Sequence, residues 1–357
     1  MRTRRDFIKL TAGGLALTGI GSGTGARAEQ GLYVPPEEGP HELTFMQWPN
    51  SRAVYRDKWW LADVQATIAN IANTIAAFEP VVMLADKRQH RAARKLLSDQ
   101  VELWDIPTED LWCRDSGPLT AFRGTERVLS HVQFNGWGGK QNDRNDARVA
   151  ERVADALGFD VVPSGVIGEY GGVEHDGHGL LLAHESSWVN SNRNPGQSRQ
   201  QIEASLLAAY GAERMIWAEG VYDQDITDYH IDSLARFTGA GRVLANMPIQ
   251  IDPDDPFHLA AQDTLAALRR AGLSVDVIPE PIQRRVQSFD FVASYANYYV
   301  CNGAVVMAQF GDVDTDQEAR QAMARHYPGR EIVALNVDAL GEIGGGIHCA
   351  TQQLPAA

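Results

Sequence analysis

The stretch Ala293-Ser-Tyr-Ala-Asn-Tyr-Tyr-Val-Cys301 turns at Asn302-Gly303 into a second apolar run, Ala304-Val-Val-Met-Ala-Gln-Phe310. An Asn-Gly pair between two apolar runs is a strong signal for a β-hairpin. A helical stretch over about 315–326 follows, and then an apolar strand over 331–335. The sequence therefore predicts a unit of strand, turn, strand, helix and strand.

The same order recurs earlier in the chain, over residues 43–84, 111–163, 172–217 and 230–278. The unit at 43–84 has only one strand before its helix, and the last strand, near 346–352, can supply the missing partner and close a ring. Repeats that bury a face only against their neighbours favour a closed radial assembly of five ββαβ units. A doubly wound sheet is the alternative, but paired strands before each helix are typical of hairpins.

The first 28 residues have the features of an export signal. Paired arginines at Arg4-Arg5 precede a short apolar stretch, Leu15–Ile20, and Ala26-Arg27-Ala28 offers a small-x-small cleavage site. This order resembles a twin-arginine signal, with an ordinary signal peptide as the alternative. No linker divides the rest, so we expect one domain over 29–357 that is released folded to the periplasm or beyond.

The chain is strongly acidic, with 32 basic and 46 acidic residues and a net charge of −14. Such a charge repels nucleic acid and anionic lipid and attracts small cations. No long uncharged apolar run follows the signal, so we expect no membrane association afterwards, and a homo-oligomer is left open. The three cysteines, Cys113, Cys301 and Cys349, are too few for a disulfide framework, and their odd number leaves at least one thiol unpaired within the chain.

Polar residues gather at the predicted first strand of each unit. These clusters are Trp112-Cys-Arg-Asp115, Glu174-His-Asp176, His230-Ile-Asp232 and Gly344-Gly-Gly-Ile-His-Cys349. In a closed ring the starts of these strands converge on the axis. On a strand, His230 and Asp232 would face the same way, and Arg114 would point away from the axis that Asp115 faces.

Cys349 follows three glycines and a histidine. A free cysteine is most often a buried core residue. Glycines allow close backbone approach, however, and a thiol beside a histidine in an oxidising compartment favours a nucleophile.

Several motifs in consistent order resemble the agmatine deiminases, a family that also includes bacterial peptidylarginine deiminases. The resemblance runs from about Leu43 to Pro355 and rests on Trp112-x-Arg-Asp-x-Gly-Pro118, Phe134-Asn-x-Trp-Gly-Gly139, Asn192-Arg-Asn-Pro195, His230-Ile-Asp232, Ala293-Ser-Tyr-x-Asn297, Gln309-Phe-Gly-Asp312 and Gly344-Gly-Gly-Ile-His-Cys-x-Thr-Gln-Gln353. It implies the pentein α/β-propeller, a ring of five ββαβ units.

The resemblance also implies the chemistry. Cys349 matches the nucleophile, His230 the general acid and base, and Asp115 and Asp232 the carboxylates that hold a guanidinium. A small cationic guanidine, agmatine first, would be hydrolysed through a covalent adduct without metal or cofactor. Around the substrate we expect Trp112, Glu174, Asp176, Tyr229 and Glu169, with Tyr229 over an apolar tail and Glu169 or Glu174 near a terminal ammonium.

The sequence departs from the family pattern near the expected substrate tail. Tyr229 stands where glycine is usual, Ser233 where asparagine is usual, and Glu169 lies one place early in the Glu-Gly-Gly motif. Arginine or peptidylarginine therefore remains an alternative substrate. A metal-dependent hydrolase that uses the His and Asp clusters, and a non-catalytic periplasmic binder of polyamines or guanidines, are alternatives of other kinds.

Overall fold

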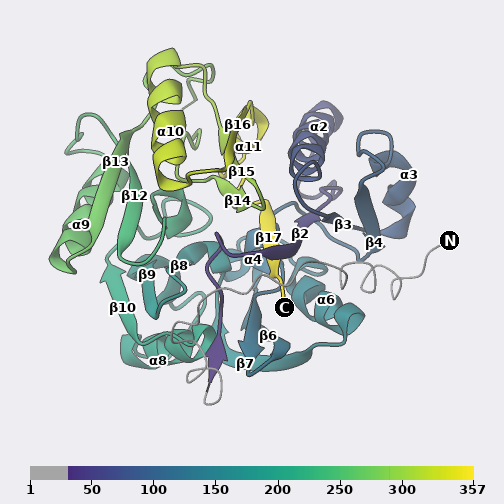
Figure 1. Cartoon of the computed structure of the whole chain (residues 1–357), viewed down its shortest axis with the longest axis horizontal. Helices are drawn as coiled ribbons and strands as arrows, with labels where there is room; N and C mark the ends of the chain where they lie inside the picture. The colour runs from purple at the N-terminus through teal and green to yellow at the C-terminus, as the bar shows by residue number, and fades with distance from the viewer. Residues whose placement is uncertain (1–30, 289) are drawn as a thin grey trace.

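The computed structural model describes residues 31–288 and 290–357. The predicted export signal lies outside these residues. Five small sheets surround a central axis, and the long helices α2, α6, α8, α9 and α10 lie on the outside of the ring (Figure 1). The ring of five units expected from the sequence is confirmed.

Every sheet has the same core of three strands. The second strand of a unit lies in the middle, antiparallel to the first strand and parallel to the third, which follows the helix. The sheets of the units at 230–278 and 293–335 contain only these three strands. These units consist of η4 (Ile231–Ser233), β11 (Ala235–Phe237), β12 (Arg242–Met247), α9 (Pro256–Arg270) and β13 (Ser274–Pro279), and of β14 (Tyr299–Cys301), β15 (Ala304–Ala308), α10 (Val313–His326), β16 (Glu331–Leu335) and α11 (Asp338–Gly341).

The units at 111–163 and 172–217 carry additional short elements. They consist of α4 (Cys113–Ser116), β5 (Thr120–Arg123), β6 (Glu126–Gln133), α5 (Gly136–Gly139), η2 (Asp146–Arg148), α6 (Val149–Leu157) and β7 (Asp160–Ile167), and of η3 (Tyr170–Gly172), β8 (Val173–His175), β9 (Leu180–His184), α7 (Glu185–Trp188), α8 (Arg199–Tyr210) and β10 (Arg214–Ala218). Strand β1 (Leu32–Tyr33) extends the first of these sheets by pairing with β5.

The ring is closed by the two ends of the described chain. The unit at 43–84 contains β2 (His41–Gln47), α2 (Lys58–Ile75), β3 (Val81–Ala85), η1 (Lys87–Gln89), α3 (His90–Ala93) and β4 (Val101–Asp105). Strand β17 (Thr351–Pro355) pairs antiparallel with β2 and thereby supplies the partner that this unit lacks. The expected closure is confirmed, although the strand begins a few residues later than predicted.

The predicted first strands are much shorter than expected, and the same difference recurs around the ring. Residues 113–116 form α4, 231–233 form η4, and 293–298 contain no strand, so β5, β11 and β14 begin only after the polar motifs. The alternation of side chains along a strand therefore does not decide which way these polar side chains face. The structure instead presents most of them from turns that lead into the strands, whereas Glu174 and His175 lie on β8.

Local sequence signals account for the helix ends. Ser198 and Gln201 form a capping box at the start of α8, and Gly211 ends that helix in the left-handed conformation. Asp255 accepts hydrogen bonds from the first backbone amides of α9, and Pro256 occupies its first turn. Within the described residues, no helix is long and apolar enough to cross a membrane.

Candidate active site

Three of the predicted site residues converge on Gly171, in the turn before β8. A Cβ atom built on Gly171 would lie 2.7 Å from Asp115 Oδ1, 2.9 Å from His230 Nδ1 and 3.2 Å from Asp232 Oδ2. Asp115 comes from α4, His230 precedes η4 and Asp232 lies within it. Two turns from different units thus place two carboxylates and an imidazole around the backbone of a glycine in a third unit, which has no side chain to fill the space.

Cys349 lies at the same place, near the end of the turn over 347–350 that leads into β17. Its Sγ atom is 3.4 Å from Asp232 Oδ2 and 3.0 Å from Asn297 Nδ2, and its backbone N–H donates to Asn297 Oδ1 at 3.2 Å. A Cβ atom on Gly345 would lie 2.6 Å from the Trp112 ring and 3.3 Å from Sγ, so the indole reaches the neighbourhood of the thiol. The glycines before Cys349 are therefore required for close packing, as the sequence predicts.

The thiol is neutral when the site holds no cation. Burial raises the pKa of Cys349 well above its usual value, and the negative charges of Asp232 and then Asp115 raise it further. Asp232 has the opposite shift: burial opposes ionisation, but the hydrogen bond and charge of His348 lower the pKa of Asp232. Asp232 Oδ1 is buried and has no hydrogen-bond partner among the described residues, which is costly unless a donor binds there.

Asp115 is held in place by two donors. Trp137 Nε1 donates to Oδ2 at 2.9 Å, and the Gly171 N–H donates to Oδ1 at 3.2 Å. Burial, with the nearby charges of Glu169 and Asp232, raises the pKa of Asp115 to about 6. Trp137 has a positive φ of 54°, a strained conformation for a bulky residue, and this bend is what brings its indole N–H to the carboxylate.

His230 is held between carboxylates. Its Nε2 lies 3.1 Å from Glu169 Oε2 and its Nδ1 lies 3.7 Å from Asp115 Oδ1. Burial alone would lower the pKa of His230, but Asp115 and the hydrogen bond to Glu169 raise it to about 9. Glu169 is fixed in turn by Arg193, which is fully buried and also contacts Asp228 at 2.6 Å. His230 is therefore protonated at neutral pH.

Four of the residues expected to surround the substrate contact protein groups in the structure. They are Glu169, Glu174, Asp176 and Tyr229. The Glu169 carboxylate binds His230 and Arg193, and Glu174 Oε1 lies 2.7 Å from Arg236 Nε. Asp176 accepts the backbone N–H groups of His178 and Leu180 within the β8–β9 hairpin. The Tyr229 ring stacks on His184 and meets Phe257 edge-on. Asp176 and Tyr229 are thus not brought together with Cys349.

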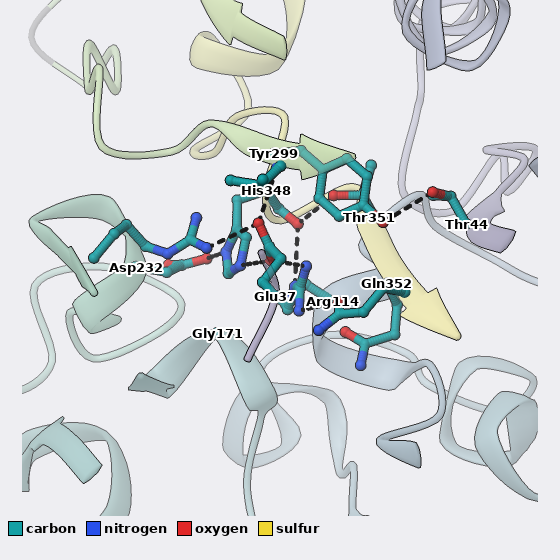
Figure 2. Close-up of polar contacts among 12 residues, drawn as sticks. Glu37, Thr44, Arg114, Gly171, Asp232, Tyr299, His348, Thr351 and Gln352 are labelled. Atoms are coloured by element: carbon teal, nitrogen blue, oxygen red, sulfur yellow. Dashed lines mark hydrogen bonds and ion pairs between the residues drawn. The ribbon is translucent and has the colours of Figure 1, made fainter. Parts of the chain in front are cut away.

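Glu37 is a site-proximal residue that sequence reasoning missed. It comes from the segment between β1 and β2 and lies next to His348 and Arg114 (Figure 2). It also contacts Arg236 and Val300, so its partners come from several units and it lies at the centre of the ring. Its Oε2 is 2.9 Å from Arg114 Nη2 and 3.1 Å from His348 Nε2, while Oε1 is 3.0 Å from Arg236 Nη2. The expectation that Arg114 points away from the axis was wrong, because Arg114 lies on a helical turn rather than on a strand.

Asn297 was also missed as a site residue, although its motif was part of the resemblance. Both ends of its amide contact Cys349, and its side chain packs against Gly346. All three cysteines are buried and unpaired, so the structure contains no disulfide between them.

Comparisons with known proteins agree with this geometry. The family model described as Porphyromonas-type peptidyl-arginine deiminase matches residues 33–355, and the chain belongs to this family of guanidine-modifying enzymes. A Streptomyces coelicolor protein named "Putative agmatine deiminase" is 36% identical over 90% of this chain and 98% of its own length.

One further relative and one solved structure are named as agmatine deiminases without the word "putative". The agmatine deiminase of Stutzerimonas stutzeri is 32% identical over 93% of this chain and 98% of its own length. The solved structure of the Enterococcus faecalis agmatine deiminase superposes with a TM-score of 0.83 at 26% identity, covering 93% of this chain and 98% of that one. The fold is therefore the pentein α/β-propeller of these enzymes.

Proposed function

We propose that this chain is a hydrolase that converts agmatine and water to N-carbamoylputrescine and ammonia, with Cys349 as the nucleophile. The observation that carries the proposal is the unpartnered, buried Asp232 Oδ1 beside Cys349, opposite Asp115 across Gly171. A guanidinium presents a planar set of N–H donors and keeps its charge in a protein, so two carboxylates bind its edges. The names of the relatives support agmatine as the guanidine.

The shifted pKa values support a defined order of steps. A guanidinium between Asp115 and Asp232 offsets their charges and lowers the pKa of Cys349, which loses its proton to solvent as the substrate binds. The thiolate adds to the guanidinium carbon, and protonated His230 gives its proton to the departing amino group, which leaves as ammonia. Neutral His230 then takes a proton from water, which attacks the thiouronium carbon. The carbon–sulfur bond breaks to restore the thiolate, and the new hydroxyl group loses its proton to solvent as the ureido carbonyl forms.

The test is a comparison of substrates with purified protein. Ammonia release and ureido product are measured with agmatine, free arginine and a peptidylarginine, and the highest kcat/KM is expected for agmatine. Free arginine needs a cation for its α-carboxylate. The axial arginines, Arg114 and Arg236, are already engaged by Glu37 and Glu174. A preference for arginine or peptidylarginine would reassign the substrate, and binding without ammonia release would leave a binder rather than an enzyme.

We also propose export of the chain by the twin-arginine route. The support is the order of Arg4-Arg5, the apolar stretch and Ala26-Arg27-Ala28 in the sequence. Replacement of both arginines by lysine should keep the protein in the cytoplasmic fraction of a bacterial host. Unchanged recovery in the periplasmic fraction would contradict the proposal.

A further inference from the structure

A chain of hydrogen bonds leads from the nucleophile to the axis of the ring. Asp232 Oδ2, which faces Cys349 Sγ at 3.4 Å, is also 2.7 Å from His348 Nδ1. His348 Nε2 is 3.1 Å from Glu37 Oε2. The His348 ring thus lies between two carboxylates, and one of them shares its oxygen with the thiol (Figure 2). Both ring nitrogens donate only when the imidazole is protonated.

The His348 ring is surrounded by charged groups. The carboxylates of Asp232, Glu37 and Glu174 lie within 4.0 Å of its ring nitrogens. The carboxylate of Glu38 and the guanidiniums of Arg114 and Arg236 line the same cavity of about 20 Å³. His175 also lines this cavity, but burial lowers its pKa to about 3, so it stays neutral. Except for the half-buried Glu38, these charged groups are buried. Carboxylates therefore outnumber guanidiniums around the His348 ring, and a buried excess of one charge is costly.

We propose that Glu37 and His348 are positioning residues that let Cys349 ionise, because the protonated His348 offsets the charge on the Asp232 oxygen nearest the thiol. The same contact occupies Oδ2 and leaves Oδ1 for the guanidinium. Glu37 holds the Nε2 side of the His348 ring and is itself fixed by Arg114 and Arg236. This inference rests on the proposed role of Cys349 as nucleophile and concerns how its thiolate forms.

The chain of contacts from Glu37 through His348 and Asp232 to Cys349 is called the relay here. It is tested without substrate by the alkylation of Cys349. The rate constant for iodoacetamide labelling of Cys349 is measured as a function of pH by peptide mass spectrometry, which separates it from Cys113 and Cys301. Glu37→Gln and His348→Asn remove the charge and keep similar shapes. In each variant the midpoint of the labelling rate against pH should lie at least about one pH unit higher than in the wild-type protein. At a fixed pH below the pKa of the thiol, this shift corresponds to about a tenfold slower rate. Once His348 is Asn, adding Glu37→Gln should cause no further shift.

The matched control is Glu79→Gln. Glu79 is a buried carboxylate 3.1 Å from a buried histidine, His41, and neither contacts Asp232 or Cys349 within the described part of the chain. This variant should keep the wild-type labelling curve. An equal shift in the control, or unchanged curves in folded Glu37→Gln and His348→Asn proteins, would overturn the relay.

The steady-state kinetics give an independent readout. Loss of the His348 proton leaves Asp232 more negative, so the relay variants should lose at least about tenfold in kcat while KM for agmatine stays the same or falls. A raised KM with unchanged kcat would instead mean that Glu37 only shapes the pocket, and would overturn the proposal. A wild-type enzyme that releases no ammonia would count against the proposed function, while the labelling curves would still decide the relay.

Discussion

Cys349 is surrounded by groups that stabilise a bound cation, and nothing in the described site replaces its sulfur as a nucleophile. A serine hydroxyl at this position ionises far less readily than a thiol. We therefore expect Cys349→Ser to lose ammonia release by at least about a thousandfold. The buried volume changes little, so the thermal midpoint should stay within a few degrees of wild type. Near-normal turnover in a folded Cys349→Ser enzyme would exclude the covalent mechanism.

The pKa shifts at the site predict an alkaline optimum. The reactive form of the free enzyme has protonated His230 and ionised Cys349, but the pKa of His230 is about 9 and that of Cys349 is higher, so this form is rare at neutral pH. In the free enzyme, log kcat/KM should therefore rise with unit slope from about pH 6 to about pH 9. Below about pH 6, protonation of Asp115 should steepen the slope.

The Asp115→Asn variant distinguishes the steep part of the pH profile below about pH 6 from the unit-slope rise above it. The amide removes one charge-assisted clamp on the guanidinium, and kcat/KM should fall more than about tenfold, equivalent to about 1.4 kcal/mol. The steep part of the profile below about pH 6 should disappear, and the rise should end at a lower pH than in the wild-type enzyme, because Asp115 also raises the pKa values of His230 and Cys349. A plateau that begins below about pH 7.5 in the wild-type enzyme would contradict the assignment of His230 as the protonated acid.

At the same scale, sequence reasoning found residues that carry reactive groups and missed those that support them. Cys349, His230, Asp232 and Asp115 belong to dense polar motifs, and the structure brings all four together. Glu37 lies in a Pro- and Gly-rich segment with no periodic pattern, so nothing local indicates that it reaches the axis. Its position depends on contacts with Arg114, Arg236 and His348, which are distant in sequence.

At the scale of elements, the turn η3 keeps open the space where a guanidinium is expected. Gly171→Ala would place a methyl group 2.7 Å from Asp115 Oδ1 and 2.9 Å from His230 Nδ1, closer than such contacts allow. We expect KM for agmatine to rise at least about tenfold, because the methyl group occupies the binding space and displaces its ligands. Steady-state kinetics and isothermal titration measure the effect. Unchanged KM in a folded variant would place the substrate elsewhere.

The second strands, helices and third strands of the units were predicted closely, because apolar runs, Gly turns and helix caps are local signals. Residues 331–335 and the Asn302-Gly303 turn lie where expected. The first strands were predicted too long. In 230–233 and 112–116 the polar side chains bind one another across the ring, and these long-range contacts stabilise turns where the alternating pattern suggests a strand.

For the whole molecule, ring closure depends on β17. Removal of residues 351–357 would leave the edge of β2 unpaired and expose the buried Leu43, Phe45 and Met46 to solvent. We expect such a protein to lose cooperative unfolding and to be recovered mainly in aggregates. Removal of Ala357 alone is the control and should leave both properties unchanged. A soluble, cooperatively unfolding protein without β17 would show that closure is dispensable.

The number of units and the closing partner were predictable from the sequence, because each unit repeats one pattern and one unit lacks a strand. The sequence did not predict how the helices pack around the ring or that residues 34–38 lie at its centre. That segment contacts several units through Tyr210, Arg236, Val300 and Arg330, and such contacts have no signature within any single repeat.

The pairing of β17 with β2 also sets the order in which the protein becomes active during synthesis. Among the described elements β17 leaves the ribosome last, immediately after Cys349, whereas its partner β2 and the axial Glu37 leave near the beginning. Contacts between segments so far apart in the chain form late, since the intervening loop must close first. The nascent chain therefore carries every carboxylate of the site before it carries the nucleophile, and the site is completed only when β17 pairs with β2.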